Sequence, residues 1–343
     1  MARERNQTLD LMRLAAAFAV VCIHFRFPGV FGEAVIALAR FAVPFFFIVT
    51  GLYLFRGERV AVAARLRARV KSTLLLILIS NGVYLCFRLI VGTLLDGKTA
   101  LEVLSGIFTP QSVIALLVFN ESPVFMHLWY LNAMLGLLLA ALLCHRLLPR
   151  VTRSKALYAA VPALLTLLVL FGKYSKTVMG FQISGFQPYY LRNALFTGLP
   201  CLLLGKLIGE NESAVAHIGK AALCAAPPLL ALCTLGEFFL TKYLLPAGVG
   251  SVYISTVPLA ASLVLLALRY PQNNMKQLSR LGGSCSLMIY IVHPMFGQLL
   301  RAAISGSQSV VLRSTVAPAA FAASLCFAVL HDKWRGRLRK PSA

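Results

Sequence analysis

The sequence has few charged residues, and very few of them are acidic. Only 13% of its 343 residues are charged, and Asp and Glu together number 11. Soluble domains carry about 25% charge, and disordered chains are rich in charge and poor in apolar residues. Here 59% of the residues are apolar and the mean hydropathy is +0.80. Disorder is therefore excluded, a water-soluble enzyme is disfavoured, and a protein embedded in a lipid bilayer fits.

Motifs that would indicate metal, disulfide or nucleotide chemistry are also missing. The eight cysteines include no C-x-x-C pair and lie mostly in apolar runs, so neither a disulfide framework nor a zinc site is expected. A phosphate-binding loop, a Gly-x-Ser-x-Gly elbow and a metal-ligand cluster are all absent from the sequence. We expect no metal and no permanently bound cofactor. Without repeats, low-complexity segments or a dividing linker, residues 1–343 are expected to form one membrane domain with a basic cytoplasmic tail, 331–343.

Long apolar runs predict an all-α, polytopic membrane helix bundle with about ten transmembrane helices. A membrane-spanning helix needs about 20 mostly apolar residues. The runs that fit are 9–27, 34–55, 72–95, 124–144, 156–172, 189–209, 221–241, 251–268, 283–300 and 314–330. The apolar stretch 113–119 is too short to cross, and we expect it to be re-entrant or interfacial.

The basic residues predict the orientation of these spans. Lys and Arg number 33, and they lie in the short gaps between apolar runs rather than in one stripe, so nucleic-acid binding is disfavoured. With the N-terminus in the cytoplasm, 21 of them fall inside, 8 outside and four within spans. Both termini are therefore expected to be cytoplasmic. Arg3 and Arg5 precede the first span as they would in a signal peptide, but Asp10, Arg13 and the lack of a small-residue cleavage site predict a retained helix.

Three ionisable residues lie on one face of the first predicted helix. From Arg13 to His24 the helix makes three turns plus about 20°, and Asp10 lies one turn before Arg13. The rise from Arg13 to His24 is about 16 Å, which places a cation near the cytoplasmic end and an imidazole towards the outer side. Ionisable residues within spans are costly and usually functional. The alternative is that Asp10 and Arg13 are interfacial anchors and His24 is a boundary residue.

The same residues carry a resemblance to a known family. Leu9-Asp10-x-x-Arg13, ten further residues and His24 resemble the opening helix of the acyltransferase 3 family, integral membrane enzymes that acylate, mostly O-acetylate, surface glycans and other extracytoplasmic acceptors. Arg, ten residues and His form a weak motif alone, but further segments match in order over nearly the whole chain. These segments are Arg40 to Gly51, His127 to Leu131, Arg192 to Gly198 with Leu204-Gly205, and Ser286 to Pro294.

The resemblance implies transfer of an acyl group from cytoplasmic acetyl-CoA, as co-substrate, to an extracytoplasmic hydroxyl at the bacterial inner (plasma) membrane. His24 is then the base, a role that suits an imidazole near neutral pH. Arg13 is expected to hold phosphates or pantetheine carbonyls of the donor, and Asp10 to orient Arg13. The acceptor is expected to be a cell-envelope glycan or lipid-linked saccharide. No added hydrolase-like domain is present, so transfer is expected to be direct or through a separate protein.

Other matching residues have two interpretations each. Arg40 contacts either the acyl carbonyl or a structural carboxylate. Where the family has paired Arg residues and a Pro, this sequence alternates basic residues from Arg65 to Lys71, and we take Arg69 as the donor-binding equivalent. His127 and Trp129 line the acceptor pocket, unless Trp129 is an interfacial anchor. His293, which precedes Pro294, is interpreted as structural.

A second function stays open. The Val-Pro-Phe-Phe-Phe and Asn-x-Leu-Phe-x-Gly segments also resemble the membrane domain of vancomycin-type serine racemases. That resemblance implies a transporter of a small polar substrate such as serine. The absence of obvious broken-helix pairs or inverted repeats speaks against it. Dependence on coenzyme A separates the two, because a transporter needs none.

Overall fold

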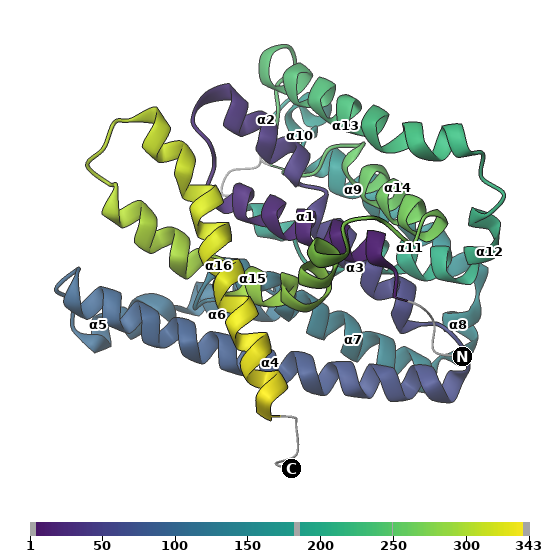
Figure 1. The fold of residues 1–343 in the computed structure, drawn as a ribbon, viewed down its shortest axis with the longest axis horizontal. Coiled ribbons are helices and arrows are strands. Elements are labelled where there is room, and N and C mark those ends of the chain that lie inside the picture. The colour runs from purple at the N-terminus through teal and green to yellow at the C-terminus, as the bar shows by residue number, and fades with distance from the viewer. Residues whose placement is uncertain (1–4, 182–185, 249, 339–343) are drawn as a thin grey trace. The chain divides into compact units, whose positions relative to one another are not determined.

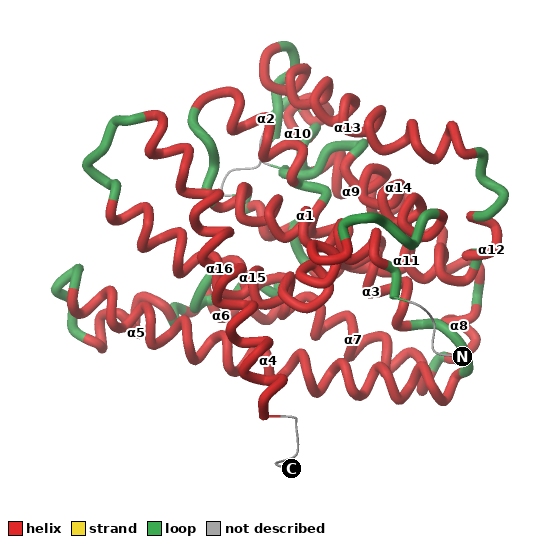
Figure 2. Tube along the Cα trace, viewed as in Figure 1, coloured by secondary structure: helices red, strands yellow, loops and turns green. Residues whose placement is uncertain are grey.

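The protein is helical throughout the described part of the chain. The structure, a computed structural model, describes residues 5–181, 186–248 and 250–338. About 80% of the described residues are helical, and no strand occurs within these ranges (Figures 1 and 2). The prediction of an all-α fold is confirmed. Arg3, Arg339 and Lys340, which contribute to the predicted orientation, lie outside the described residues.

The helices follow one another with short connections. Their bounds are α1 Gln7–His24, α2 Gly29–Ala39, α3 Ala42–Leu54, α4 Arg59–Leu94, α5 Ala100–Ile107, α6 Pro110–Phe119, α7 Trp129–Leu147, α8 Pro149–Arg153, α9 Ala160–Phe171, α10 Ser175–Met179, α11 Leu199–Glu210, α12 Glu212–Val215, α13 Lys220–Tyr243, α14 Thr256–Arg269, α15 Lys276–Ala303 and α16 Val310–Leu338. Single 3-10 turns cover Met126–Leu128, Lys155–Ala159 and Pro188–Tyr190, and a π-helical turn covers Ala194–Gly198.

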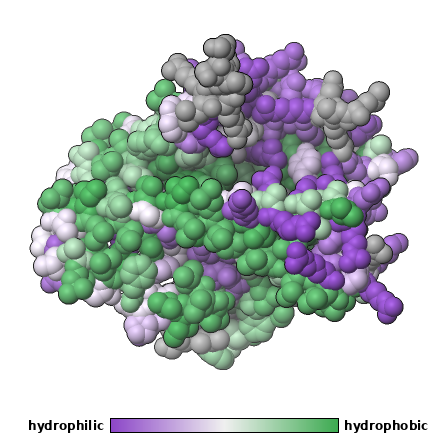
Figure 3. Space-filling model, turned by 90° about the horizontal axis from the view of Figure 1, so that it is seen from below, coloured by the Kyte–Doolittle hydropathy of each residue, from purple (hydrophilic) through white to green (hydrophobic). Residues whose placement is uncertain are grey.

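Within the described residues, seven helices are long and apolar enough to cross a membrane, and the chain is a multi-pass membrane protein. They are Gln7–His24, Gly29–Leu54, Arg59–Leu94, Met126–Leu147, Lys220–Tyr243, Lys276–Ala303 and Val310–Gly336. Each overlaps one expected span. The face in Figure 3 carries a broad area of apolar residues, as a lipid-facing surface requires.

The remaining expected spans correspond to shorter or irregular helices. Lys155–Phe171 and Thr256–Arg269 are apolar but short, and 189–209 begins with irregular turns before α11. The stretch 113–119, predicted to be re-entrant or interfacial, lies in α6, which is bent by 43° from α5. Such a pair is a broken span or a re-entrant loop, and the count of ten spans stays a prediction.

The chain forms two compact units. Unit 1 contains residues up to Phe46, 211–240 and 253–338, and unit 2 contains 47–210 and 241–252. A single membrane domain over residues 1–343 stays a prediction.

In unit 1, α1 and α15 pack side by side and run parallel. Asp10 lies against Gly282 and Gly283, and fourteen or fifteen residues further along both helices the Phe25 ring lies against Gly297. A Cβ at any of these glycines would collide with α1 or its side chains. Small residues at helix crossings permit this close approach, which is typical of membrane helix pairs.

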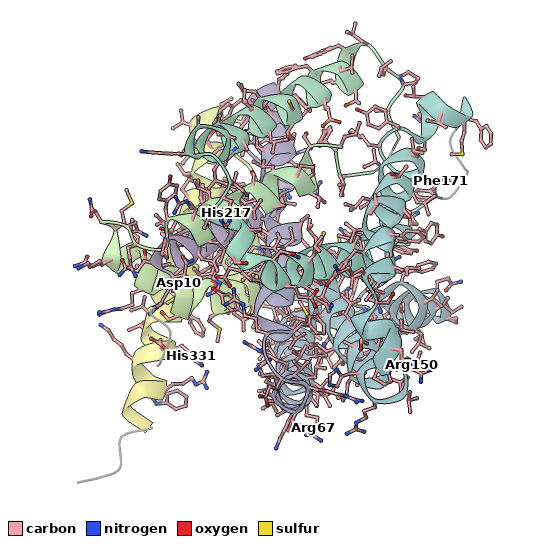
Figure 4. The ribbon with its side chains drawn as sticks, turned by 90° about the vertical axis from the view of Figure 1, so that its right-hand side faces the viewer. Asp10, Arg67, Arg150, Phe171, His217 and His331 are labelled. Atoms are coloured by element: carbon pink, nitrogen blue, oxygen red, sulfur yellow. The ribbon has the colours of Figure 1, made fainter. Side chains whose placement is uncertain are left out.

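In unit 2, α4 and α7 run antiparallel, while α3 and α11 run parallel. Arg59 at the start of α4 donates to the carbonyl of His145 near the end of α7 at 3.0 Å. On α11, Gly205 and Gly209 pack against the α3 backbone at Ile48 and Leu52. In Figure 4, Arg67 and Arg150 lie towards the same end of this unit, and Phe171 lies towards the other.

The parallel pairs constrain the number of crossings. Two spans can run parallel only if an odd number of crossings separates them. Between α1 and α15 lie four of the long spans, an even number. Crossings by the segments of α9, α11 and α14 make seven, which is the number that the ten-span prediction places there.

Candidate functional site

The cytoplasmic end predicted for α1 is fixed by polar contacts. Asn6 caps the helix, since its Oδ1 accepts the Leu9 N–H at 2.8 Å. Its Nδ2 donates to the carbonyl of Ala267 near the end of α14, also at 2.8 Å. The first turn of α1 is thereby attached to another helix of unit 1, which holds the positions of the charged residues that follow.

Asp10 is buried between two arginines. Its side chain is 5% exposed, and it pairs with Arg13 at 2.6 Å and with Arg5. A Cβ at Gly283 of α15 would collide with both the Asp10 carboxylate and the Arg5 guanidinium, so this glycine makes room for the ion pair. Two guanidinium groups around one carboxylate leave one positive charge, and the Arg13 side chain remains 26% exposed.

Helical periodicity therefore predicts that Asp10 and Arg13 lie together, but it does not predict the contact of Arg5 with Asp10. Arg5 precedes the helix, and its contacts with the carbonyls of Ser279 and Arg280 depend on how α15 packs against α1. No spacing rule within α1 indicates that position.

His24 is the last residue of α1 and is exposed. Its ring centroid lies 5.1 Å from that of His293 on α15, and the two ring planes are inclined by 51°. His293 itself is fully buried. The structure thus pairs the predicted base with a second imidazole that the sequence presents as structural.

Pro294 explains how His293 is held. A proline has no N–H, so the Tyr290 carbonyl, four residues earlier, has no helical donor. The Nδ1 of His293 lies 2.8 Å from this carbonyl and 3.1 Å from that of Ile289. Carbonyl oxygens only accept, so Nδ1 carries the proton. The His-Pro order in an apolar helix is the sequence signal for this arrangement.

The two predicted donor-binding arginines outside α1 belong to different units, Arg40 to unit 1 and Arg69 to unit 2. Arg40 is half-buried at the break between α2 and α3, where its N–H caps α2 on the Ile36 carbonyl at 3.2 Å. Arg69 is exposed on α4. Arg65, in the same basic run, donates to the Leu54 carbonyl at 3.1 Å and to the Arg56 carbonyl. Arg65 therefore holds the end of α3, and Arg69 is open to solvent or ligand.

The predicted acceptor residues lie in unit 2 and are buried. His127 is 2% exposed, and its ring lies 4.8 Å from Tyr84 and 5.2 Å from Phe125. Trp129, 6% exposed, begins α7 and lies 5.3 Å from the guanidinium of Arg192. Contact with an acceptor would need an opening at these rings, so their role stays a prediction.

An ion pair beside Trp129 was not predicted. Arg192 donates to both carboxylate oxygens of Glu121, at 2.9 and 3.2 Å. Burial raises the pKa of Glu121 above its ordinary value, although the charge and hydrogen bonds of Arg192 act in the opposite direction. Asn120, in a left-handed conformation with φ 62°, accepts the Ala194 N–H at 3.0 Å. Together these contacts attach the loop before α7 to the π-helical turn.

No group of three or more His, Cys, Asp and Glu side chains suited to a metal occurs among the residues that the structure places. The chemically active groups are two neighbouring imidazoles, His24 and His293, the positively charged start of α1, and buried ion pairs. Residues 6–332 match the acyltransferase 3 family, described as an acyltransferase domain.

The chain belongs to the acyltransferase 3 family. The match to that family covers α1 to α15 and most of α16. The resemblance seen in the sequence is therefore confirmed. No solved structure gives a significant match.

Two curated relatives have racemase names. A serine/alanine racemase of Enterococcus gallinarum is 28% identical over 315 residues, which are 84% of this chain and 40% of that protein. An amino-acid racemase of Enterococcus faecalis is 34% identical over 149 residues, 41% of this chain and 20% of that protein. The chain thus spans less than half the length of either relative.

Proposed function

We propose that this protein transfers an acetyl group from cytoplasmic acetyl-CoA to a hydroxyl of a cell-envelope glycan or lipid-linked saccharide, in a bacterial inner membrane. The observation that carries the proposal is the exposed His24 at one end of α1 with the Asp10–Arg13 ion pair at the other, in a chain of an acyltransferase family. His24 acts as the base, Arg13 binds the donor, and Asp10 positions Arg13.

The charge at the α1 start supports binding of an anionic donor. The two arginines around Asp10 leave a net positive charge, which attracts an anionic donor. Guanidinium groups bind phosphate oxygens and carbonyls with charge-assisted hydrogen bonds. Arg69 is available for such a contact, and Arg40 is a candidate for the acyl carbonyl.

The reaction has two steps, and one base serves both: it takes a proton in the first step and returns it in the second. The acceptor hydroxyl gives its proton to His24 while its oxygen attacks the thioester carbonyl carbon. The carbon–sulfur bond then breaks, and the departing thiolate takes the proton from the His24 imidazolium. His24 returns to its neutral form, so an exposed imidazole without a metal accounts for the proton balance.

Titration of the detergent-solubilised protein with acetyl-CoA tests the donor site. Arg13→Ala is expected to weaken binding about 10- to 100-fold, since a hydrogen bond to a charged group contributes about 1.5–3 kcal/mol. His217→Ala, at an exposed position between α12 and α13, is the control and is expected to bind like the wild type. No binding by folded wild-type protein would contradict the proposal.

Acetyl transfer to envelope saccharides tests the base. His24→Ala is expected to lower the rate at least about 100-fold, as loss of a general base does, with unchanged expression and unchanged acetyl-CoA affinity. Transfer at the wild-type rate by this variant would rule out His24 as the base.

The second candidate function is transport of a small polar substrate such as serine. The similarity to the two proteins named as racemases leaves this alternative open, although the match covers only 40% and 20% of their lengths. Uptake of labelled serine by vesicles that lack coenzyme A would support transport, and acetyl-CoA binding that requires Arg13 would support the acyltransferase.

A further inference from the structure

Arg5 contacts both α1 and α15 at the Asp10 ion pair, and the proposed function assigns it no ligand. Its Nε donates to Oδ2 of Asp10, and its Nη2 donates to the carbonyls of Ser279 and Arg280, at 3.4 and 3.3 Å. Within the described part of the chain, no acceptor faces its Nη1, which carries two N–H groups. The Arg5 side chain is 52% exposed, so a ligand can reach it.

Arg5 and Arg13 contact different oxygens of one carboxylate. Arg13 Nη1 donates to Oδ1 of Asp10 at 2.6 Å, whereas Arg5 donates to Oδ2. Each guanidinium lies one hydrogen bond from the same carboxyl group, so the two positive charges are neighbours, and Asp10 neutralises only one of them. The Asp10 side chain is 5% exposed and that of Arg13 is 26% exposed. The start of α1 therefore presents two accessible guanidinium groups around a buried carboxylate.

The packing of α15 holds the Arg5 guanidinium in place. A Cβ at Gly283 would collide with Nη2 of Arg5 and with Oδ2 of Asp10, so only glycine leaves room for the group. Its hydrogen bonds to Asp10 and to the two α15 carbonyls fix its orientation. A side chain that is already ordered loses less entropy when a ligand binds. Arg5 is thus prepared to bind an anion with Nη1.

We propose that Arg5 is a binding residue for the donor, and that its Nη1 and the Arg13 guanidinium together bind the diphosphate of coenzyme A. A diphosphate has charged oxygens on two linked phosphorus atoms, so it can contact two neighbouring guanidinium groups at once. Hydrogen bonds between guanidinium and phosphate are strong because both partners are charged. A pantetheine carbonyl, with one uncharged oxygen, makes no use of the second arginine.

This assignment of the ligand rests on the proposed function, whereas a site for a diphosphate anion does not. Arg5 makes the protein selective, since donors that contain the diphosphate bind better than acyl thioesters without phosphate. The phosphate of an anionic phospholipid headgroup has the same chemistry as that of coenzyme A. The experiments therefore have to distinguish these two sources.

Three thioesters with decreasing phosphate content test which group Arg5 contacts. Acetyl-CoA has the diphosphate and a phosphate on the ribose, acetyl-dephospho-CoA has the diphosphate alone, and S-acetylpantetheine has no phosphate. We expect Arg5→Gln to weaken binding of both coenzyme A forms equally, about 5- to 20-fold, because a charged hydrogen bond is lost at a half-exposed site. Binding of S-acetylpantetheine is expected to stay unchanged. A loss confined to acetyl-CoA, or an equal loss for all three ligands, would overturn the proposal.

The matched control is Arg335→Gln, which removes the same charge at an exposed position on α16 of the same unit and is expected to bind like the wild type. Thermal unfolding in detergent identifies variants that fail to fold. Should Arg5→Gln fail to fold, Arg5→Lys keeps the charge beside Asp10 and is expected to weaken binding about 2- to 5-fold, since an ammonium lacks the planar fork. Wild-type affinity for acetyl-CoA in the variant that folds would overturn the proposal.

A double variant separates direct contact from an effect through Arg13. If Arg5 only holds Asp10 and thereby Arg13, then Arg5→Gln has no further effect once Arg13 is replaced by alanine. Direct contact predicts that Arg5→Gln with Arg13→Ala binds acetyl-CoA more weakly than Arg13→Ala alone. Equal affinities of these two variants would overturn the proposal and leave Arg5 as a structural partner of Asp10.

Inorganic diphosphate and phosphatidylglycerol identify the source of the phosphate. In detergent without phospholipid, we expect inorganic diphosphate to compete with acetyl-CoA for the wild type and to bind Arg5→Gln more weakly. Phosphatidylglycerol added to the micelles is expected to leave acetyl-CoA bound. Displacement of acetyl-CoA by this lipid, in the wild type but not in Arg5→Gln, would assign the site to a headgroup and overturn the proposal.

The same measurements distinguish failure of this inference from failure of the proposed function. Diphosphate binding that depends on Arg5, in a folded protein that transfers no acetyl group, means that the proposed function fails and the anion site stands. Acetyl transfer from acetyl-CoA, with equal affinities in the wild type and Arg5→Gln, means that the function stands and the role of Arg5 fails.

Discussion

At the residue scale, the buried Asp10 carboxylate holds Arg5 and Arg13 at the start of α1, so the stability of this end of the helix depends on its charge. In Asp10→Asn the arginines at positions 5 and 13 face each other without a carboxylate between them. We expect the free energy of unfolding to fall by about 1–3 kcal/mol, because a charged hydrogen-bond partner is removed from a buried site. Thermal unfolding in detergent measures this change. Asp332→Asn, at an exposed position on α16, is the matched control and is expected to melt like the wild type.

The same substitution separates structure from donor binding. Arg13 keeps its charge in Asp10→Asn but loses its fixed orientation, so acetyl-CoA binding is expected to weaken less than in Arg13→Ala. An unchanged melting temperature would show that the ion pair contributes nothing to stability, and binding weaker than in Arg13→Ala would assign Asp10 a direct role.

How far the sequence predicts the site depends on whether a contact lies within one helix. Helical periodicity places Asp10, Arg13 and His24 on α1, since a fixed rotation per residue decides it. Arg5 pairs with Asp10 from the segment before α1, and His293 lies beside His24 through the packing of α15, and no spacing in α1 reveals either contact. A tryptophan in an interfacial position and a buried one have the same sequence pattern, so the burial of Trp129 was not predictable.

At the scale of elements, glycine determines how closely α3 and α11 approach. A Cβ at Gly205 would collide with the Ile48 carbonyl, which is backbone and cannot rotate away. Gly205→Ala is therefore expected to destabilise the protein by about 1–3 kcal/mol, the usual cost of overpacking. Gly82→Ala on α4 meets nothing within 4 Å and is expected to be neutral or stabilising by up to about 1 kcal/mol through helix propensity.

Melting temperatures of the two glycine variants, measured in the same detergent, test this difference. Equal effects would mean that α3 and α11 can separate without cost. The sequence predicts both helices from their apolar content, but their crossing depends on a contact between segments about 150 residues apart.

At the scale of the whole molecule, hydropathy predicts most crossings because each long apolar run must avoid water. Seven expected spans correspond to long helices, but α9 and α14 are shorter than a typical span. Hydropathy does not decide whether these short helices cross the membrane. The parallel packing of α1 with α15 and of α3 with α11 does constrain it, because an odd number of crossings must separate the members of each pair. Between α3 and α11, crossings by α4, α7 and α9 make three, because the antiparallel packing of α4 and α7 requires that the bent pair α5–α6 between them does not cross.

Labelling of introduced cysteines tests this topology. In a variant without the eight native cysteines, Arg67→Cys and Arg150→Cys are expected to be protected from an impermeant maleimide in spheroplasts and labelled in inside-out vesicles, because basic loops stay in the cytoplasm. Lys98→Cys and Met126→Cys, exposed residues before and after the bent pair, are both expected to react in spheroplasts. Labelling of those two positions from opposite sides would show that α5–α6 is a crossing, and it would contradict the antiparallel packing of α4 and α7, which requires an even number of crossings between them.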